Sequence, residues 1–362
     1  MARPSAPSVA IEFDHFIGIN NIPKGAIFHP NGQNYLFAAG GNIVIAHLTD
    51  NHGQEFLRRH DDYITAVALS KNGRYIASGQ RGTNSNVVVW DFASREILFV
   101  CEEHDFEITA IDFSDDERVL ATLGSQEDGK ICFWDVSNGY VVAQSTKVPL
   151  GTRCLSFNGK VRDIKRRDTN RYLCCTAGRD GVMLWDLDAV TGDLMPIRLA
   201  GDGRATLSRD IFAIAFTDDK ETIFCATHTG DFLVGSLRSL KIVQAVQATK
   251  LGLLSIAALP DGGVVLGCGD CTLKVFDASY TLRREATLDG SVLGLSPSPD
   301  RIEVLAITSK GTVARVNLSS LDSITLSEAH TQVRTCPNPN HNPNPNRGPH
   351  EGAHMPTPHS RP

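Results

Sequence analysis

Short apolar runs alternate with turn-forming residues along most of the chain. A representative unit has an apolar run at residues 64–69, a Lys-Asn-Gly turn at 71–73, a second run at 75–78 and a third that ends in VVVWD at 87–91. Runs of this length, bounded by Gly, Asn, Pro or Asp, are typical of β-strands joined by tight turns. No stretch sustains the 3.6-residue apolar period of a long helix. The pattern therefore predicts an all-β protein.

The unit repeats along the chain. Trp90-Asp91, Trp134-Asp135, Trp185-Asp186 and Phe276-Asp277 each end an apolar run. With weaker copies at positions 46, 235 and 316, successive ends are 44, 44, 51, 50, 41 and 40 residues apart. A Trp-Asp dipeptide that recurs at roughly 40–45 residues is the signature of a β-propeller blade. We predict a seven-bladed WD40 β-propeller, with six or eight blades as alternatives because three copies are degenerate.

The repeat divides the chain into three regions. Residues 1–24 form a lead, in which residues 9–19 can supply a strand that closes the ring, and residues 25–327 form the propeller. Residues 328–362 form a low-complexity tail, and 8 of the 17 prolines lie in its last part, 336–362. Proline at every second position is incompatible with a sheet or helix, so we expect this Pro/Asn-rich C-terminal tail to be disordered.

Composition narrows the class of protein. The chain has 35 basic and 41 acidic residues and thus a net charge of −6. It therefore lacks the overall positive charge that is typical of a nucleic-acid-binding protein. No apolar run approaches the roughly 18 residues that span a membrane, and residues 1–10 lack the apolar core of a secretory signal. The nine cysteines lie mostly inside apolar runs, as expected of small buried hydrophobes in a reducing compartment. We expect a soluble intracellular protein that binds neither nucleic acid nor membrane.

The common catalytic motifs are missing from the sequence. It contains no phosphate-binding loop, no zinc-protease motif, no nucleophile elbow and no calcium-binding loop. Cys268 and Cys271 form a lone C-x-x-C that we interpret as a turn between strands. We therefore expect no catalytic site, cofactor, metal or small-molecule substrate; the alternative is an enzyme whose site is assembled from scattered loops at the propeller axis.

Certain polar residues recur at fixed places in the repeat. His60 and His104 each stand 30 residues before a tryptophan, and this equal spacing favours a structural role over that of a catalytic base. The arrangement resembles the buried network of WD-repeat proteins generally, in which a histidine, a Ser or Thr, an Asp and the tryptophan are hydrogen-bonded. The resemblance implies such networks in the second unit (His60, Ser78, Trp90), the third (His104, Thr122, Asp128, Trp134) and the fourth (Thr176, Asp180, Trp185), which has no histidine.

One segment is strongly basic. Residues 160–171, KVRDIKRRDTNR, carry six cations against two carboxylates: Lys160, Arg162, Lys165, Arg166, Arg167 and Arg171. The segment is interpreted either as a solvated edge of the fourth blade or as a surface that docks on an acidic protein. Nucleic acid is disfavoured because no aromatic residues are interleaved with the cations.

Three stretches carry a more specific resemblance. YIASGQRGTNSNVVVWDFASREILF, LATLGSQEDGKICFWDV and TAGRDGVMLWDLD are similar to the N-terminal half of the cilia- and flagella-associated protein 52 family, and the similarity extends over residues 11–330. The resemblance implies a non-enzymatic structural scaffold of motile cilia, whose partners are tubulin in the lumen of doublet microtubules and other axonemal proteins. The implied location is cytoplasm, cytoskeleton and the axoneme of the cilium or flagellum.

The resemblance leaves other functions open. Members of that family are about twice as long and have two propellers, whereas this sequence diverges near His330. The echinoderm-microtubule-associated-protein-like family also has a Gly-Gln pair before an enlarged turn. The alternatives are therefore a cytoplasmic microtubule-associated propeller or a general WD-repeat adaptor.

Overall fold

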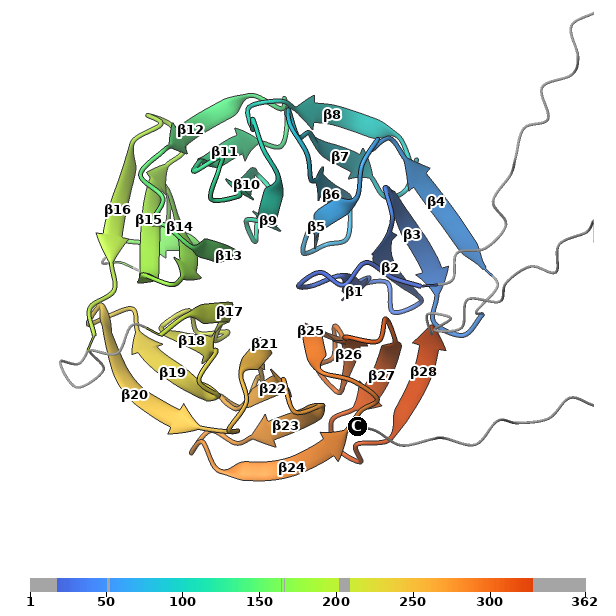
Figure 1. Cartoon of the computed structure of the whole chain (residues 1–362). Helices are drawn as coiled ribbons and strands as arrows, with labels where there is room; N and C mark the ends of the chain where they lie inside the picture. Colours follow the sequence, from blue (N-terminus) through green and yellow to red (C-terminus); the bar gives the residue numbers. More distant parts are fainter. Residues whose placement is uncertain (1–17, 51–52, 164, 166, 202–208, 328–362) are drawn as a thin grey trace, which may run out of the picture. The chain divides into compact units, whose positions relative to one another are not determined.

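The fold is a ring of seven β-sheets. The structure, a computed structural model, describes residues 18–50, 53–163, 165, 167–201 and 209–327. These residues form 28 β-strands in seven four-stranded sheets arranged around an axis (Figure 1). The predicted seven-bladed β-propeller is confirmed, as is the choice of seven blades over six or eight. Within these ranges, no helix is long and apolar enough to cross a membrane.

Four consecutive strands make each blade. Blade one comprises β1 (Ala26–Phe28), β2 (Asn34–Ala39), β3 (Asn42–His47) and β4 (Gln54–Arg58). Blade two comprises β5 (Ile64–Leu69), β6 (Tyr75–Gln80), β7 (Val87–Asp91) and β8 (Ile97–Cys101). Blade three comprises β9 (Ile108–Phe113), β10 (Val119–Gly124), β11 (Ile131–Asp135) and β12 (Val141–Ser145). Blade four comprises β13 (Thr152–Arg162), β14 (Asp168–Gly178), β15 (Gly181–Asp188) and β16 (Leu194–Arg198).

The remaining blades follow the same order. Blade five comprises β17 (Ile211–Phe216), β18 (Thr222–Thr227), β19 (Asp231–Ser236) and β20 (Lys241–Gln247). Blade six comprises β21 (Leu253–Ala258), β22 (Val264–Cys268), β23 (Thr272–Phe276) and β24 (Leu282–Thr287). Blade seven comprises β25 (Val292–Pro297), β26 (Glu303–Thr308), β27 (Val313–Asn317) and β28 (Ser323–Ser327).

Every blade is an antiparallel meander. Its first strand lies nearest the axis, and its fourth strand lies at the outer circumference of the ring (Figure 1). Because direction alternates, the turns after first and third strands meet at one end of the ring, and the loops after second and fourth strands meet at the other. Gly73, at a φ of 78°, supplies the left-handed residue of one such turn. Trp90 and Trp134 lie opposite Ile76 and Leu120, on buried third strands.

The hydrophobic core is divided among the interfaces between neighbouring blades. Seven clusters of buried side chains each join two adjacent sheets. In the cluster between blades three and four, Phe133 packs edge-on against Phe157, with their ring centroids 6.2 Å apart, and Trp185 is fully buried. Burying a side chain of this size stabilises the fold by about 1.5–3 kcal/mol, so each interface contributes substantially.

Cysteine thiols lie within four of these interfaces. Burial raises the pKa of Cys132 to about 12 and that of Cys268 to about 11. These and four further buried cysteines are distributed between blades two and three (Cys101, Cys132), three and four (Cys174), four and five (Cys175, Cys225) and five and six (Cys268). The expectation that the cysteines of the apolar runs are buried hydrophobes is confirmed for these six.

The ring closes where blade one meets blade seven. Ala26 and Phe28 pack with Leu305 and Ile307, and the Phe28 amide donates to Ser296 Oγ at 3.1 Å. All four described strands of blade seven come from residues 292–327. Most of the predicted closing strand, residues 9–17, lies outside the described residues. In the described part of the chain, side-chain packing and this hydrogen bond hold the first and seventh sheets together.

Asn20, in the segment before β1, joins two blades through its amide. Its Oδ1 accepts from the Gly40 amide at 2.7 Å, and its Nδ2 donates to the carbonyls of Gly40 and Ile64, both at 2.9 Å. Gly40 directly follows β2 of blade one, and Ile64 begins β5 of blade two. A single side chain thus bonds to three backbone groups of two blades.

We expect Asn20→Ala to lower the free energy of unfolding by about 1–2 kcal/mol, because three backbone groups lose a part-buried partner. Urea denaturation measures the change. Asn72→Ala is the matched control, since the Asn72 side chain is exposed in a turn. Equal stability of the two variants would contradict a role for Asn20 in joining the blades.

Candidate functional site

The polar residues predicted in the third unit come together in a buried chain of hydrogen bonds. Trp134 Nε1 donates to Thr122 Oγ1 at 2.9 Å, Thr122 Oγ1 lies 2.7 Å from His104 Nε2, and His104 Nδ1 lies 2.7 Å from Asp128 Oδ2. Thr122 and Trp134 are on paired strands, whereas His104 and Asp128 come from the loops before β9 and before β11. We call this chain the blade-three relay.

The donors and acceptors of the relay fix the imidazole tautomer. The Thr122 oxygen accepts from the indole, so its hydroxyl hydrogen is free to donate to His104 Nε2. Because the Asp128 carboxylate can only accept, the proton of a neutral His104 resides on Nδ1 and is donated to Asp128. Each buried polar group in the chain therefore has a partner.

Asp128 also holds the loop that carries His104. Its Oδ1 accepts from the amides of Asp105 and Phe106 at 2.7 and 3.3 Å. Burial, the largest influence, raises the pKa of Asp128, but the bonds from His104 and these two amides outweigh it and leave this pKa below its ordinary value. The carboxylate therefore remains charged at neutral pH, and its surroundings are built to receive that charge.

Blade two contains a similar chain of hydrogen bonds, in which a different residue accepts from the histidine. Trp90 Nε1 donates to Ser78 Oγ at 3.1 Å, and Ser78 lies 2.7 Å from His60 Nε2. His60 Nδ1 meets Gln80 Oε1 at 2.7 Å, and Gln80 Nε2 donates to Asp61 at 2.6 Å. Sequence analysis assigned no role to Gln80, although its place at the end of β6, two residues after Ser78, was the available signal.

The fourth blade keeps only part of the predicted network. Trp185 Nε1 donates to Thr176 Oγ1 at 2.9 Å. Asp180, however, is exposed, and its backbone carbonyl accepts from Arg198. The loop between β14 and β15 has only two residues, so it cannot fold back over the strands as the six-residue loop of blade three does. Including Asp180 in this network was wrong.

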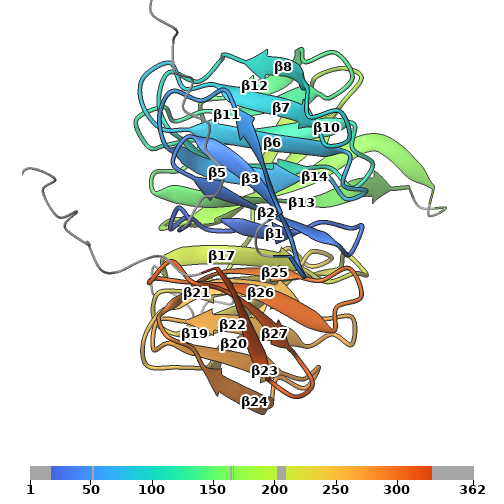
Figure 2. The ribbon, with the colours of Figure 1, turned by 90° about the vertical axis from the view of Figure 1, so that its right-hand side faces the viewer.

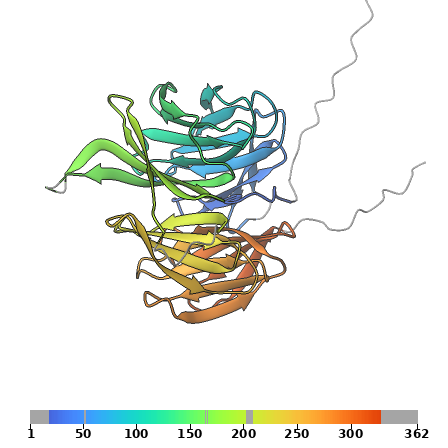
Figure 3. The same ribbon diagram turned by 60° about the vertical axis from the view of Figure 1, so that its left-hand side comes forward.

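The basic segment forms a hairpin that extends beyond the ring. Strands β13 and β14 have 11 residues each, about twice the length of their counterparts, and they project from the end of the ring that carries the short turns (Figures 2 and 3). Gly159, at a φ of 97°, forms a bulge where β13 leaves the blade. We call residues 158–163, 165 and 167–172 the arm.

Carboxylates of the protein itself pair with most of the predicted basic patch. Lys160 lies 2.9 Å from Asp116, and Arg171 pairs with Asp186; both of these acids are largely shielded from solvent. Arg162–Asp168 at 3.1 Å and Arg167–Asp163 at 2.8 Å are exposed pairs. Lys165 is exposed near the tip, and Arg166 lies outside the described residues.

Two hollows accompany these features. A groove of about 580 Å³ runs between the arm and blade three, lined in part by Asp116, Tyr172 and Val190. Near the axis, a cavity of about 60 Å³ is lined in part by Lys24, Arg153 and Phe212. Ligand pockets occupy roughly 300–1,000 Å³, so the axial cavity is too small for an ordinary small-molecule substrate. Among the described residues, no three His, Cys, Asp or Glu side chains gather in a way that could hold a metal ion.

Comparison with known proteins identifies WD repeats. The family model for the WD domain, G-beta repeat, matches residues 54–91 and 95–135, which span strands of blades one to three. The solved structure of U3-55K superposes with a TM-score of 0.65 at 16% identity, covering 82% of this chain and 90% of that one. This likeness shows the propeller fold alone. The residues that the family model matches are thus WD repeats.

Curated relatives confirm the more specific resemblance. The chain is 31% identical over 260 residues to cilia- and flagella-associated protein 52 of Chlamydomonas reinhardtii, which covers 70% of this chain and 40% of the relative. It is 26% identical over 336 residues to the Bos taurus protein of that name, covering 90% of this chain and 52% of the relative. The chain thus spans about half the length of these curated relatives.

We expect Asp128→Ala to lower the free energy of unfolding by about 2–3 kcal/mol, because His104 and two amides lose their buried acceptor. Glu127→Ala is the control, since Glu127 is an exposed carboxylate in the same loop. Urea denaturation of both variants measures the difference. An equally small loss for both would show that the relay contributes little to stability.

Stability should also fall in mildly acidic solution because of His60. Burial lowers the pKa of His60 in the folded protein, so the unfolded chain takes up a proton first as the pH falls below about 6.5. The free energy of unfolding then decreases between neutral pH and the folded-state pKa. We expect the drop in Tm from pH 7.5 to pH 5.5 to be smaller for His60→Asn than for the wild type. An unchanged drop would contradict this contribution.

Proposed function

We propose that this chain is a non-enzymatic structural scaffold of motile cilia and flagella, whose propeller binds the luminal surface of doublet microtubules and neighbouring axonemal proteins. The observation that supports the proposal is the similarity of up to 90% of the chain to proteins named cilia- and flagella-associated protein 52 in an alga and in mammals. Those names connect the relatives with cilia and flagella, and thus favour the axoneme as the location of this chain.

A rigid ring suits a scaffold for a physical reason. The interblade clusters fix the strands before any partner arrives, so docking orders few additional groups. Several weak contacts spread over such a surface add without the entropic cost of folding a flexible segment. The same rigidity gives a partner a defined spacing between contact points.

The arm is the surface that we propose for tubulin. Exposed ion pairs contribute only about 0–1 kcal/mol, so a carboxylate of an acidic partner can replace Asp163 or Asp168 at little cost. Arg162 and Arg167, whose side chains are 66% and 72% exposed, are therefore available together with Lys165. Lys160 and Arg171 instead hold the arm against the blades through pairs with carboxylates that are largely shielded from solvent. Tubulin surfaces are generally acidic, so the arm would orient the ring on them.

Co-sedimentation with purified microtubules tests the arm. We expect the triple variant Arg162→Gln, Lys165→Gln and Arg167→Gln to reduce the bound fraction several-fold at low salt, because it removes the exposed cations. The control is a variant with three other exposed cations neutralised: Arg238→Gln, Lys250→Gln and Lys310→Gln. Equal losses in the two variants would indicate general charge attraction and would count against an arm-specific contact.

Fractionation of axonemes tests the location. A tagged copy expressed in a ciliated cell should remain with the doublet microtubules through mild salt extraction, because a few screened charge pairs cannot dominate a broad interface. Release of all the protein with the soluble matrix would overturn the scaffold role and favour a general WD-repeat adaptor. Retention on cytoplasmic microtubules outside the cilium would favour the cytoplasmic microtubule-associated alternative.

A further inference from the structure

The end of the ring opposite the arm is strongly acidic at blades two and three. Four loops meet there: residues 59–63, 81–86, 102–107 and 125–130, which we call the acidic rim. They contain three cations, Arg59, Arg81 and Lys130, against eight carboxylates: Asp61, Asp62, Glu102, Glu103, Asp105, Glu107, Glu127 and Asp128. The whole chain has only six more acidic than basic residues. The excess of carboxylates over cations in the acidic rim is nearly as large as that of the whole chain.

The same end of other blades is nearly balanced in charge. The corresponding loops of blade six carry Lys250 and Asp270, and those of blade seven carry Lys310 and Asp289. The loops of blade four, residues 146–151 and 179–180, have two cations and one carboxylate. The acidity is therefore a property of blades two and three rather than of propeller loops in this chain generally.

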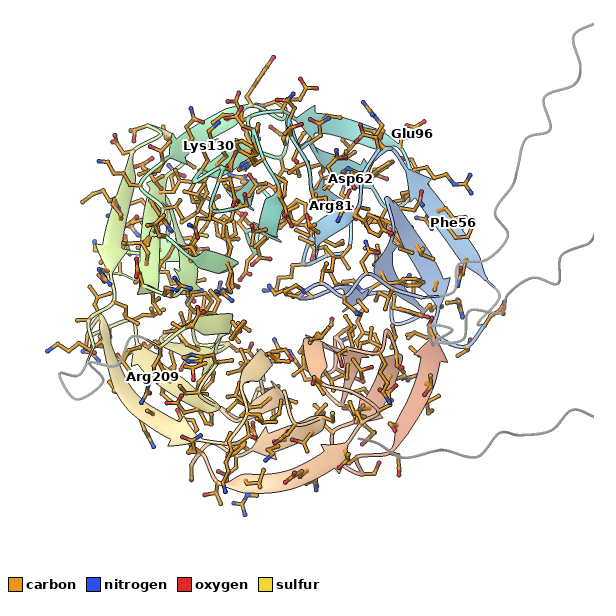
Figure 4. The ribbon with its side chains drawn as sticks, in the orientation of Figure 1. Phe56, Asp62, Arg81, Glu96, Lys130 and Arg209 are labelled. Carbon is orange, nitrogen blue, oxygen red and sulfur yellow. The ribbon has the colours of Figure 1, made fainter. Side chains whose placement is uncertain are left out.

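Several carboxylates of the rim have no cation to neutralise them. Arg81 is engaged with Asp62 at 2.9 Å, a pair labelled in Figure 4, and Lys130 with Asp105 at 2.5 Å. In the described part of the chain, Glu102 and Glu107 are in no ion pair. Burial raises the pKa of Glu107, and the like charges of Glu127 and Asp62 raise it further, against the effect of Arg81. The rim thus contains carboxylates that repel one another.

Two aromatic rings are exposed among these charges. Tyr63 is 53% exposed and Phe106 is 40% exposed. Tyr63 lies one residue and Phe106 two residues before the inner strand of its blade. The two strand starts are joined by a hydrogen bond of 2.6 Å from Thr65 Oγ1 to the Ile108 carbonyl. The Arg81 guanidinium lies 4.6 Å from the centre of the Tyr63 ring, so a cation already occupies part of this aromatic surface.

We propose that the acidic rim is a docking surface for a partner protein segment in which Lys or Arg residues alternate with apolar side chains. The unpaired carboxylates would orient the cations of such a segment and speed its encounter with the rim. Tyr63 and Phe106 would bury its apolar side chains, because exposed aromatics near a polar rim are the usual anchors of an interface. A nucleic acid or an anionic lipid surface would be repelled by the same carboxylates.

This docking surface goes beyond the proposed scaffold function and does not depend on a ciliary location. The rim and the arm lie at opposite ends of the ring, because they are formed by different sets of loops. A basic partner on the rim and an acidic partner on the arm can therefore bind one ring at the same time. Loss of microtubule binding by the arm variant would leave the rim unaffected.

Fluorescence anisotropy with defined peptides tests the proposal on the full chain. The probe is a labelled peptide of three Gly-Lys-Phe-Lys repeats, compared with analogues in which Glu replaces Lys or Ser replaces Phe. We expect the Lys-Phe peptide to bind, the Glu analogue not to bind, and the Ser analogue to bind at least about tenfold more weakly. Binding of the Lys-Phe peptide should weaken as salt is added.

Variants locate the contact. Tyr63→Ser with Phe106→Ser, and separately Glu102→Gln with Glu107→Gln, should each weaken binding of the Lys-Phe peptide about tenfold. The matched control is Tyr140→Ser with Glu96→Gln, since both residues are exposed in turns at the other end of the ring. The Tm of each variant is measured beside that of the wild type, and an unchanged Tm establishes that the ring is intact.

Three results would overturn the proposal. Absence of binding by the Lys-Phe peptide would show that the rim is not a docking surface of this chemistry. Equal binding of the Ser analogue would reduce the effect to charge attraction without an aromatic contact. An equal loss in the control variant would place the contact elsewhere on the ring.

Discussion

The need to cover both faces of every sheet governs this structure. The middle strands of a blade are buried along nearly their whole length, and only a neighbouring blade can supply the covering side chains. Each cluster therefore belongs to two blades, and the stability of any blade is shared with the next. The hydrogen-bonded relays exist within the same constraint, because a Trp, a Thr and a His can meet away from water only if every polar atom among them has a partner.

The sequence alone predicted features that recur between repeats, namely the strands of the blades and the polar residues at fixed spacing. The spacing of Trp90 and Trp134 predicted the blades, and the constant distance from each tryptophan back to His60 or His104 placed the residues that the structure joins by hydrogen bonds. Contacts that depend on the length of a loop were harder to predict from the sequence. Asp128 reaches its histidine because its loop has six residues, whereas Asp180 sits in a two-residue turn and faces solvent.

The basic segment shows the other limit of sequence reasoning. A count of charges along residues 160–171 indicates six cations, but it cannot show that Lys160 lies beside Asp116 on a different blade. Pairing with carboxylates of blades three and four sorts the cations into those that fix the arm and those that remain at the surface. The two ends of the ring therefore differ in electrical character, with cations on an arm at one end and carboxylates around aromatic rings at the other.

The buried cysteines make the ring a reporter of its own motions. A thiol whose pKa is raised by burial forms almost no thiolate at neutral pH, so alkylating reagents reach it only when its interface opens. Four neighbouring interfaces, from the one between blades two and three to the one between blades five and six, each contain at least one such thiol. The rate of labelling at each cysteine, followed by mass spectrometry, would thus give the opening free energy of one interface at a time in the natural sequence.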